Sequence, residues 1–118
     1  MAQHNKTGNL GEAMAADHLN SKGFTVLHQN WRHSHWEVDI IASKDNILHF
    51  IEVKTRLTKR FGHPEEAVDK KKLQNLINAA EEYLFRQPQW KRIQFDILAI
   101  TLLKDKPAEY FLIEDVYL

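Results

Sequence analysis

The chain has 118 residues, 43% of them hydrophobic, no cysteine, and a formal net charge of zero from 16 basic and 16 acidic side chains. The absence of cysteine excludes disulfide bonds, zinc–thiolate sites and thiol catalysis, and it fits a reducing compartment. No run of about 18 apolar residues occurs, and the N-terminal segment lacks the apolar centre of a secretory signal. We therefore expect a single cytoplasmic domain over residues 1–118, with no membrane span.

The first part of the chain predicts a helix followed by a strand. Residues 7–22 are rich in alanine, a strong helix former, and Gly23 follows as a left-handed cap. Residues 24–29 predict a short strand. The polar residues 30–35 predict a turn or loop.

Two alternating segments follow, residues 36–43 and 47–55, with a turn signal at Lys44–Asn46 between them. A strand period of two places one set of side chains of the first segment on a common face: Trp36, Val38, Ile40 and Ala42. In the second segment, the same period places Glu52 and Lys54 together on one face. The pattern predicts two neighbouring strands.

The second half of the chain predicts a helix and two more strands. Pro64 suits the first turn of an amphipathic helix over residues 65–86. Residues 92–101 predict a central strand and residues 109–113 an edge strand. The order is α-β-β-β-α-β-β, which predicts an α/β fold with one mixed sheet and a helix on each side.

An acidic pair marks the two middle strands. If they form a hairpin centred on Asp45 and Asn46, Asp39 lies directly opposite Glu52. Opposed side chains in a hairpin have Cβ atoms only about 4.5–5.5 Å apart, and like charges there repel. A divalent cation between the carboxylates would relieve this repulsion. Oxygen ligands without cysteine favour Mg²⁺ or Mn²⁺, and the main-chain carbonyl of Val53 is a further candidate ligand.

Two other charged residues complete the predicted site. Lys54 shares a face with Glu52, where a cation can orient a water molecule or stabilise the charge that develops when a phosphodiester is attacked. Glu12 lies on the small-residue face of the first predicted helix, from which it can reach the metal directly or through water. For Asp96, within an apolar strand, we expect a structural role with satisfied hydrogen bonds.

Six segments of the chain are distinctive: GNLGEAMA at residues 8–15, QNWR at 29–32, EVDIIA at 37–42, FIEVKTR at 50–56, FGHPEEAV at 61–68 and FDILAI at 95–100. In these segments the chain resembles the YraN-like family of bacterial proteins, uncharacterised protein family 0102. The six segments span nearly the whole chain. The family is similar to the PD-(D/E)xK nuclease-like superfamily and, in outline, to archaeal Holliday-junction resolvases.

The resemblance implies a restriction-endonuclease-like core and a metal-dependent nuclease. The helix glutamate of the superfamily corresponds to Glu12, its metal-binding aspartate to Asp39, and its acid-x-lysine motif to Glu52 and Lys54. The implied substrate is DNA, branched or flapped in structure. A homodimer stays open by analogy, since branched DNA has two strands to cut.

The segment that follows the acidic pair is locally basic, although the whole chain is neutral. Lysines and arginines near a catalytic edge are what phosphate contacts require, and a charged solvated surface is the other interpretation. The candidate nucleic-acid-binding residues are Arg32, Arg56, Lys59, Arg60 and Lys70. His33 and His35 are open to two interpretations, as zinc ligands or as phosphate contacts.

Two functions remain open at this stage. The first is a Mg²⁺- or Mn²⁺-dependent endonuclease that uses Glu12, Asp39, Glu52 and Lys54. The second is a non-catalytic module that binds nucleic acid or protein on a nuclease scaffold. An intact acid pair favours the first, because two unused neighbouring carboxylates would only destabilise the fold.

Overall fold

The computed structural model describes residues 6–57 and 70–116, with the side chains of residues 10–57 and 70–116. Its elements in chain order are α1 (Lys6–Ser21), β1 (Thr25–His33), β2 (Trp36–Lys44), β3 (Ile47–Arg56), α2 (Lys70–Arg86), β4 (Ile93–Thr101) and β5 (Glu109–Ile113). This order confirms the predicted α-β-β-β-α-β-β arrangement. None of the described helices is long and apolar enough to cross a membrane.

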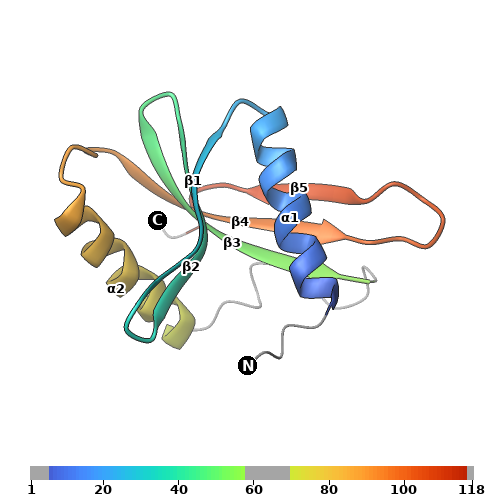
Figure 1. Ribbon diagram of the computed structural model, residues 1–118, viewed down its shortest axis with the longest axis horizontal. Helices are drawn as coiled ribbons and strands as arrows, with labels where there is room; N and C mark the ends of the chain where they lie inside the picture. The colour runs from blue at the N-terminus through green and yellow to red at the C-terminus, as the bar shows by residue number, and fades with distance from the viewer. Residues whose placement is uncertain (1–5, 58–69, 117–118) are drawn as a thin grey trace.

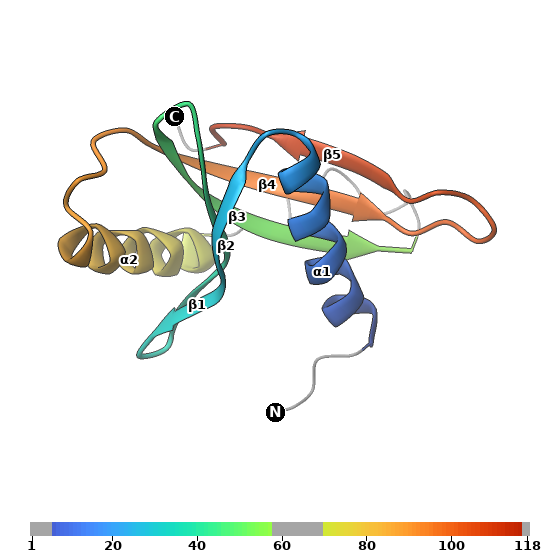
Figure 2. The same ribbon diagram turned by 45° about the horizontal axis from the view of Figure 1, so that its top comes forward.

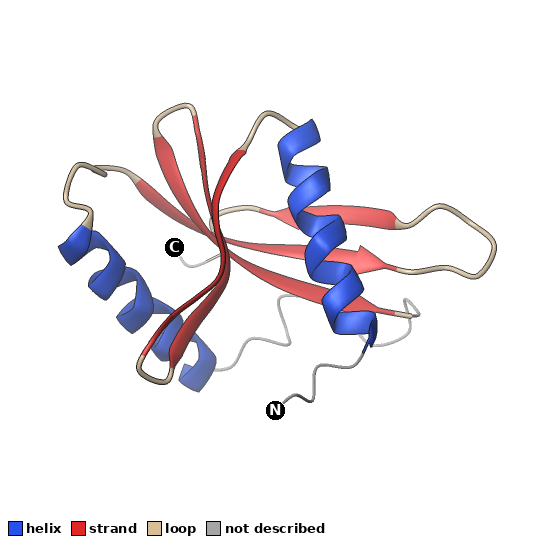
Figure 3. Cartoon of the chain, viewed as in Figure 1, coloured by secondary structure: helices blue, strands red, loops and turns tan. Residues whose placement is uncertain are grey.

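The five strands form one mixed sheet in the order β1-β2-β3-β4-β5, as Figure 1 and Figure 3 show. Neighbouring strands run antiparallel except β3 and β4, which are parallel. A parallel pair needs a long crossover, and the chain between β3 and β4 contains α2. The predicted start of this helix at residues 64–69 lies outside the described residues.

The β1–β2 hairpin is longer than predicted. Residues 30–33 belong to β1 and not to a loop, so that the turn contains only Ser34 and His35. Asn30 and Ser34 have positive φ angles of 54° and 58°. Asparagine tolerates this left-handed conformation better than most residues, which lets the strand continue through a polar segment.

The end of α1 follows the predicted cap. Gly23 has a φ of 92°, which costs little without a Cβ atom. The N–H of Phe24 donates to the Leu19 carbonyl at 3.0 Å, and the N–H of Gly23 donates to the Asn20 carbonyl at 3.3 Å. This pair of bonds is the Schellman motif, and Phe24 and Leu19 also share one hydrophobic cluster, as that motif favours.

Each face of the sheet carries its own hydrophobic cluster. On one face, Ala15 and Leu19 of α1 pack against the sheet. On the other, Leu76 and Tyr83 of α2 do so. Figure 2 shows α1 in front of β3 and β4, whereas α2 lies beside the β1–β2 hairpin.

The predicted common face of β2 is wrong in one respect. Val38 packs in the α2 cluster together with Trp36, whereas Ile40 and Ala42 pack in the α1 cluster. On the N-terminal side of Ile40, β2 pairs with β1 but has no paired residue on β3. Two-stranded ribbons twist more strongly than wide sheets, and this twist turns the outer part of β2 toward α2.

Candidate metal centre

The register between β2 and β3 places the two predicted acids, Asp39 and Glu52, opposite each other just after the last paired residues. Paired residues run from Lys44 and Ile47 to Ile40 and Ile51, and their numbers always add up to 91, as the turn predicts. The ladder ends at that pair. Asp39 and Glu52 would form the next pair, so both carboxylates stand where the two strands separate, a point that we call the fork.

A cavity of about 340 Å³ opens at the fork. Its lining includes the four predicted catalytic residues and two polar residues of α2. These six residues are Glu12, Asp39, Glu52, Lys54, Lys72 and Asn75. Four elements, α1, β2, β3 and α2, therefore contribute charged or polar side chains to one open cavity.

The carboxylate of Asp39 is held in place by the neighbouring strand. Its Oδ2 accepts a hydrogen bond from the backbone N–H of Val53 at 2.8 Å. Burial raises the pKa of Asp39 to about 7, and the negative charge of Glu52 adds to this effect. The bond from Val53 acts in the opposite direction but does not offset burial, and Glu12 and Glu37 raise the pKa further. Burial and three neighbouring carboxylates therefore act together to disfavour the ionised form of Asp39.

Two ammonium groups share the carboxylate of Glu52. Its Oε2 lies 3.6 Å from Nζ of Lys54 and 3.9 Å from Nζ of Lys72. Burial lowers the pKa of Lys54, and the neighbouring Lys72 lowers it further, against the opposing effect of Glu52. The acids and the lysines are thus coupled in one electrostatic group.

Glu12 reaches the cavity because α1 lies very close to β3. A Cβ atom added to Gly11 would overlap Oγ1 of Thr55 and would lie 3.0 Å from its Cβ. Only glycine permits this approach. The next residue along the helix, Glu12, then lines the cavity and contributes to the raised pKa of Asp39.

The donor set suits a hard divalent cation. Four carboxylates line the cavity, those of Glu12, Glu37, Asp39 and Glu52, and Mg²⁺ and Mn²⁺ prefer oxygen ligands. A divalent ion would compensate the neighbouring carboxylate charges, which add to the larger effect of burial in raising the pKa of Asp39. The carbonyl of Val53 stays a predicted ligand, since the contacts establish only its N–H bond to Asp39.

Three of the five predicted nucleic-acid-binding residues, Arg32, Arg56 and Lys70, lie among the described residues. Arg32 is exposed and forms a 2.7 Å ion pair with Glu37, a cavity-lining residue. Arg56 donates from Nε to Oγ1 of Thr101 at 3.2 Å. Lys70 is exposed at the start of α2, and Lys59 and Arg60 lie outside the described residues.

The sequence interpretation missed two contributors from α2. Lys72 and Asn75 line the cavity, and they share a helix face with buried Leu76. Residues three and four apart lie on one side of a helix, so the position of Leu76 was a usable signal. It was missed because three consecutive lysines looked equivalent in the sequence.

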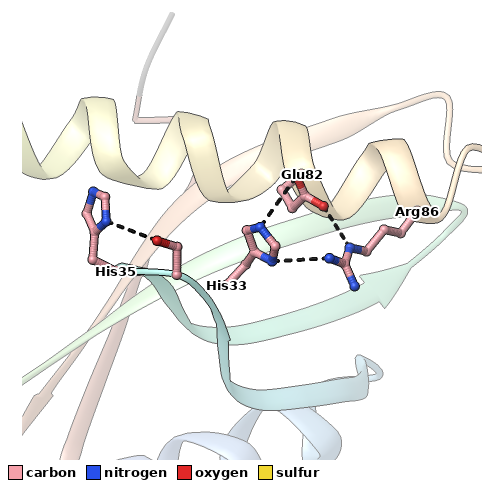
Figure 4. A network of polar contacts seen from close by, with 5 residues as sticks. His33, His35, Glu82 and Arg86 are labelled. Atoms are coloured by element: carbon pink, nitrogen blue, oxygen red, sulfur yellow. Dashed lines mark hydrogen bonds and ion pairs between the residues drawn. The ribbon is translucent and has the colours of Figure 1, made fainter.

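The tip of the β1–β2 hairpin is fastened to α2 by a polar network, shown in Figure 4. Glu82 lies 3.8 Å from Nε2 of His33 and accepts a 2.7 Å bond from Arg86. Nδ1 of His33 lies 3.1 Å from Nη2 of Arg86. His35, beyond this network, lines the cavity at the fork. The two histidines therefore have different surroundings and do not form one metal site.

Among the described residues, the group whose ligand atoms lie within 4.8 Å of one another is not at the fork but at His49, Asp96 and Glu114. The first two residues are buried and the third is exposed. His49 alternates along β3 with residues of the α2 cluster and faces the ring of Phe24 in the α1 cluster. This group therefore lies on the face of the sheet opposite Lys72.

The bonds of Asp96 agree with the predicted structural role. Its Oδ2 lies 2.6 Å from Nδ1 of His49. Its Oδ1 accepts bonds from Nε2 of Gln94 and from the N–H of Asp115, both at 2.9 Å. Both carboxylate oxygens are satisfied within the fold, as expected for a buried polar group.

Comparison with known proteins identifies relatives over most of the chain. The profile of the uncharacterised protein family UPF0102 matches residues 11–100. A UPF0102 protein from Flavobacterium johnsoniae is 43% identical over 118 residues, covering 97% of this chain and 93% of its own. One from Dictyoglomus thermophilum is 47% identical over 98 residues, covering 82% and 83% of the two chains. The names of these relatives state the family and no activity.

Proposed function

This chain belongs to the uncharacterised protein family UPF0102, and from that premise we propose that it is a metal-dependent nuclease that hydrolyses phosphodiester bonds in DNA. One observation carries the proposal. Half-buried Asp39 has its pKa raised to about 7 beside Glu52, in a cavity that also contains two lysines. Strongly perturbed carboxyl groups in a cavity are typical of sites that bind metals or catalyse reactions.

The residues of the fork have separable roles. Asp39 and Glu52 would hold Mg²⁺ or Mn²⁺, with Glu12 as a ligand or as an acceptor for a coordinated water molecule. A bound ion of this kind supplies a Lewis acid that polarises the phosphoryl oxygen and lowers the pKa of water. The N–H of Val53 fixes the orientation of Asp39, which preorganises the ligand before the ion arrives.

Lys54 acts on the substrate in this proposal. Its ammonium lies on the cavity wall, two residues beyond Glu52 on β3. A cation in a partly desolvated site stabilises the negative charge that develops on the attacked phosphate more strongly than it would in water. The same group can orient a water molecule for attack.

We further propose that the substrate is branched or flapped DNA and that the protein acts in the cytoplasm. The support is the implied likeness to junction resolvases together with a site formed at the end of a hairpin, not on a flat surface. A homodimer would supply two such sites for two strands.

A cleavage assay tests the proposal. Single-stranded, duplex, flap and four-way DNA are incubated with the protein, with and without Mn²⁺. We expect metal-dependent cleavage of at least one substrate and its loss in Asp39→Asn. Asp17→Asn, an exposed change on α1, is the matched control and should cleave like the wild type.

The same assay decides against the proposal if cleavage is absent throughout or persists in Asp39→Asn. DNA binding that needs no metal, with no cleavage of any substrate, would support the non-catalytic module instead. Circular dichroism of each variant confirms that the fold is retained.

A further inference from the structure

Building on the proposed nuclease function, we infer that Lys72 of α2 and Lys54 of β3 together form the subsite that binds a DNA phosphate beside the metal ligands. The ligand class is a phosphodiester, and the site lies on the wall of the fork cavity that α2 provides. Lys72 is in this account a positioning residue for the substrate.

The rotation of α2 selects Lys72 among three lysines. The described part of the helix begins with three exposed lysines, Lys70, Lys71 and Lys72. Only the last of them lines the cavity at the fork. It does so because Leu76, one helical turn further, is buried in the α2 cluster and fixes which side of the helix faces the sheet.

The charges around Glu52 indicate that an anion would be favoured beside Lys54 and Lys72 once a metal ion is bound. Without a metal, the carboxylate of Glu52 is the shared partner of Lys54 and Lys72, at 3.6 and 3.9 Å. When Glu52 binds a divalent cation, its negative charge is compensated by that cation. The attraction of both ammonium groups to Glu52 is then weaker, while a positive ion has been added beside them.

A phosphate is the anion that fits this gap. A phosphodiester carries one negative charge and has oxygen atoms that can accept bonds from two ammonium groups and contact the metal ion together. Asn75, three residues after Lys72 on the same helix face, adds an amide donor to the cavity wall. The subsite is therefore assembled from one strand and one helix, with the carboxylates opposite.

Binding of a fluorescently labelled flap DNA tests the inference. Anisotropy titrations in Ca²⁺, which takes oxygen ligands, and in EDTA are run over a series of salt concentrations, and gels verify that the DNA stays intact. We expect Lys72→Ala to bind about tenfold more weakly in Ca²⁺ and to lower the slope of log affinity against log salt by about one. Lys72→Arg should restore most of the affinity.

The matched control is Lys71→Ala, which removes the same charge from the adjacent position outside the cavity. Its affinity and salt slope should stay close to wild type. Equal losses in Lys71→Ala and Lys72→Ala would overturn the subsite and leave only a diffuse positive surface. Tight binding of inorganic phosphate alone would also overturn it, in favour of a small-anion site.

The two proposals can fail separately. If the wild type cleaves DNA and Lys72→Ala has an unchanged KM, the subsite is wrong and the nuclease stands. If no DNA is cleaved but Lys72→Ala alone loses affinity and salt slope, the subsite stands and the nuclease is wrong. In an active enzyme, Lys72→Ala should raise KM about tenfold with a smaller effect on kcat.

Discussion

The N–H of Val53 donates a 2.8 Å hydrogen bond to Oδ2 of Asp39 one step beyond the last antiparallel pair of β2 and β3. A side chain thus replaces the main-chain bond that the ladder would have made there. The replacement holds Asp39 beside Glu52 although both carry like charge. The hydrogen bond from the Val53 backbone therefore keeps the Asp39 carboxylate near that of Glu52, although the two groups repel each other.

The first prediction concerns stability and pH. The pKa of Asp39 is raised from 3.8 to about 7, so the native state binds more protons than the unfolded state between these values. Stability should therefore fall as pH rises from about 4 to about 7. Asp39→Asn cannot ionise at this position, so its free energy of unfolding should not fall in this way. One unit of pKa shift corresponds to 1.36 kcal/mol, and the variant should therefore be more stable than wild type by the order of 2–4 kcal/mol at pH 8. Urea denaturation in EDTA measures it.

Asp17→Asn serves as the reference for this experiment, since it changes an exposed carboxyl group on α1. Its stability difference from wild type should stay within about 0.5 kcal/mol at every pH. An advantage of Asp39→Asn that is the same at pH 4 and pH 8 would show that Asp39 ionises normally in the folded protein.

The second prediction concerns metal affinity. An ion binds the ionised form of Asp39, so each pH unit below about 7 should weaken Mn²⁺ binding by about tenfold until other ligands also titrate. Isothermal titration calorimetry at pH 5.5, 6.5 and 7.5 measures this. Asp39→Ala should abolish the binding, and Glu114→Gln should leave it intact if the ion sits at the fork. The opposite pattern would place the ion at His49, Asp96 and Glu114.

The third prediction contrasts buried Asp96 with half-buried Asp39. Asp96→Asn removes the charged partner of His49, whose Nδ1 lies at 2.6 Å, and should cost about 1.5–3 kcal/mol of stability at pH 7. Asp39→Asn should instead stabilise at that pH. Thermal denaturation of both variants provides the comparison. A stability gain in Asp96→Asn would contradict the structural role of this residue.

The fourth prediction concerns the contact between α1 and β3. Gly11→Ala would ordinarily stabilise a helix by about 1 kcal/mol. Here the added methyl group meets Thr55, and we expect a loss of about 1–3 kcal/mol together with weaker Mn²⁺ binding, because Glu12 is displaced. The double variant with Thr55→Ala should recover part of the stability. A stabilised single variant would show that α1 does not approach β3 so closely.

Local signals in the sequence determined much of this fold. The turn at Asp45 and Asn46, both with positive φ, sets the register of β2 against β3 and so brings Asp39 and Glu52 to the same level. Gly23 ends α1 as predicted, and β5 has the predicted bounds. These features depend on the conformational preferences of a few adjacent residues, which the sequence states directly.

Only the tertiary structure decided which charges meet at the fork. Lys72 and Glu52 are twenty residues apart and come together because the packing of Leu76 sets the rotation of α2. Arg32 pairs with Glu37 because the hairpin is longer than its polar sequence suggested. Val38 leaves the face of Ile40 because an unsupported ribbon twists. The first outcome depends on packing between distant segments, and the other two depend on how far the β1–β2 hairpin extends and twists, which its residue pattern does not encode.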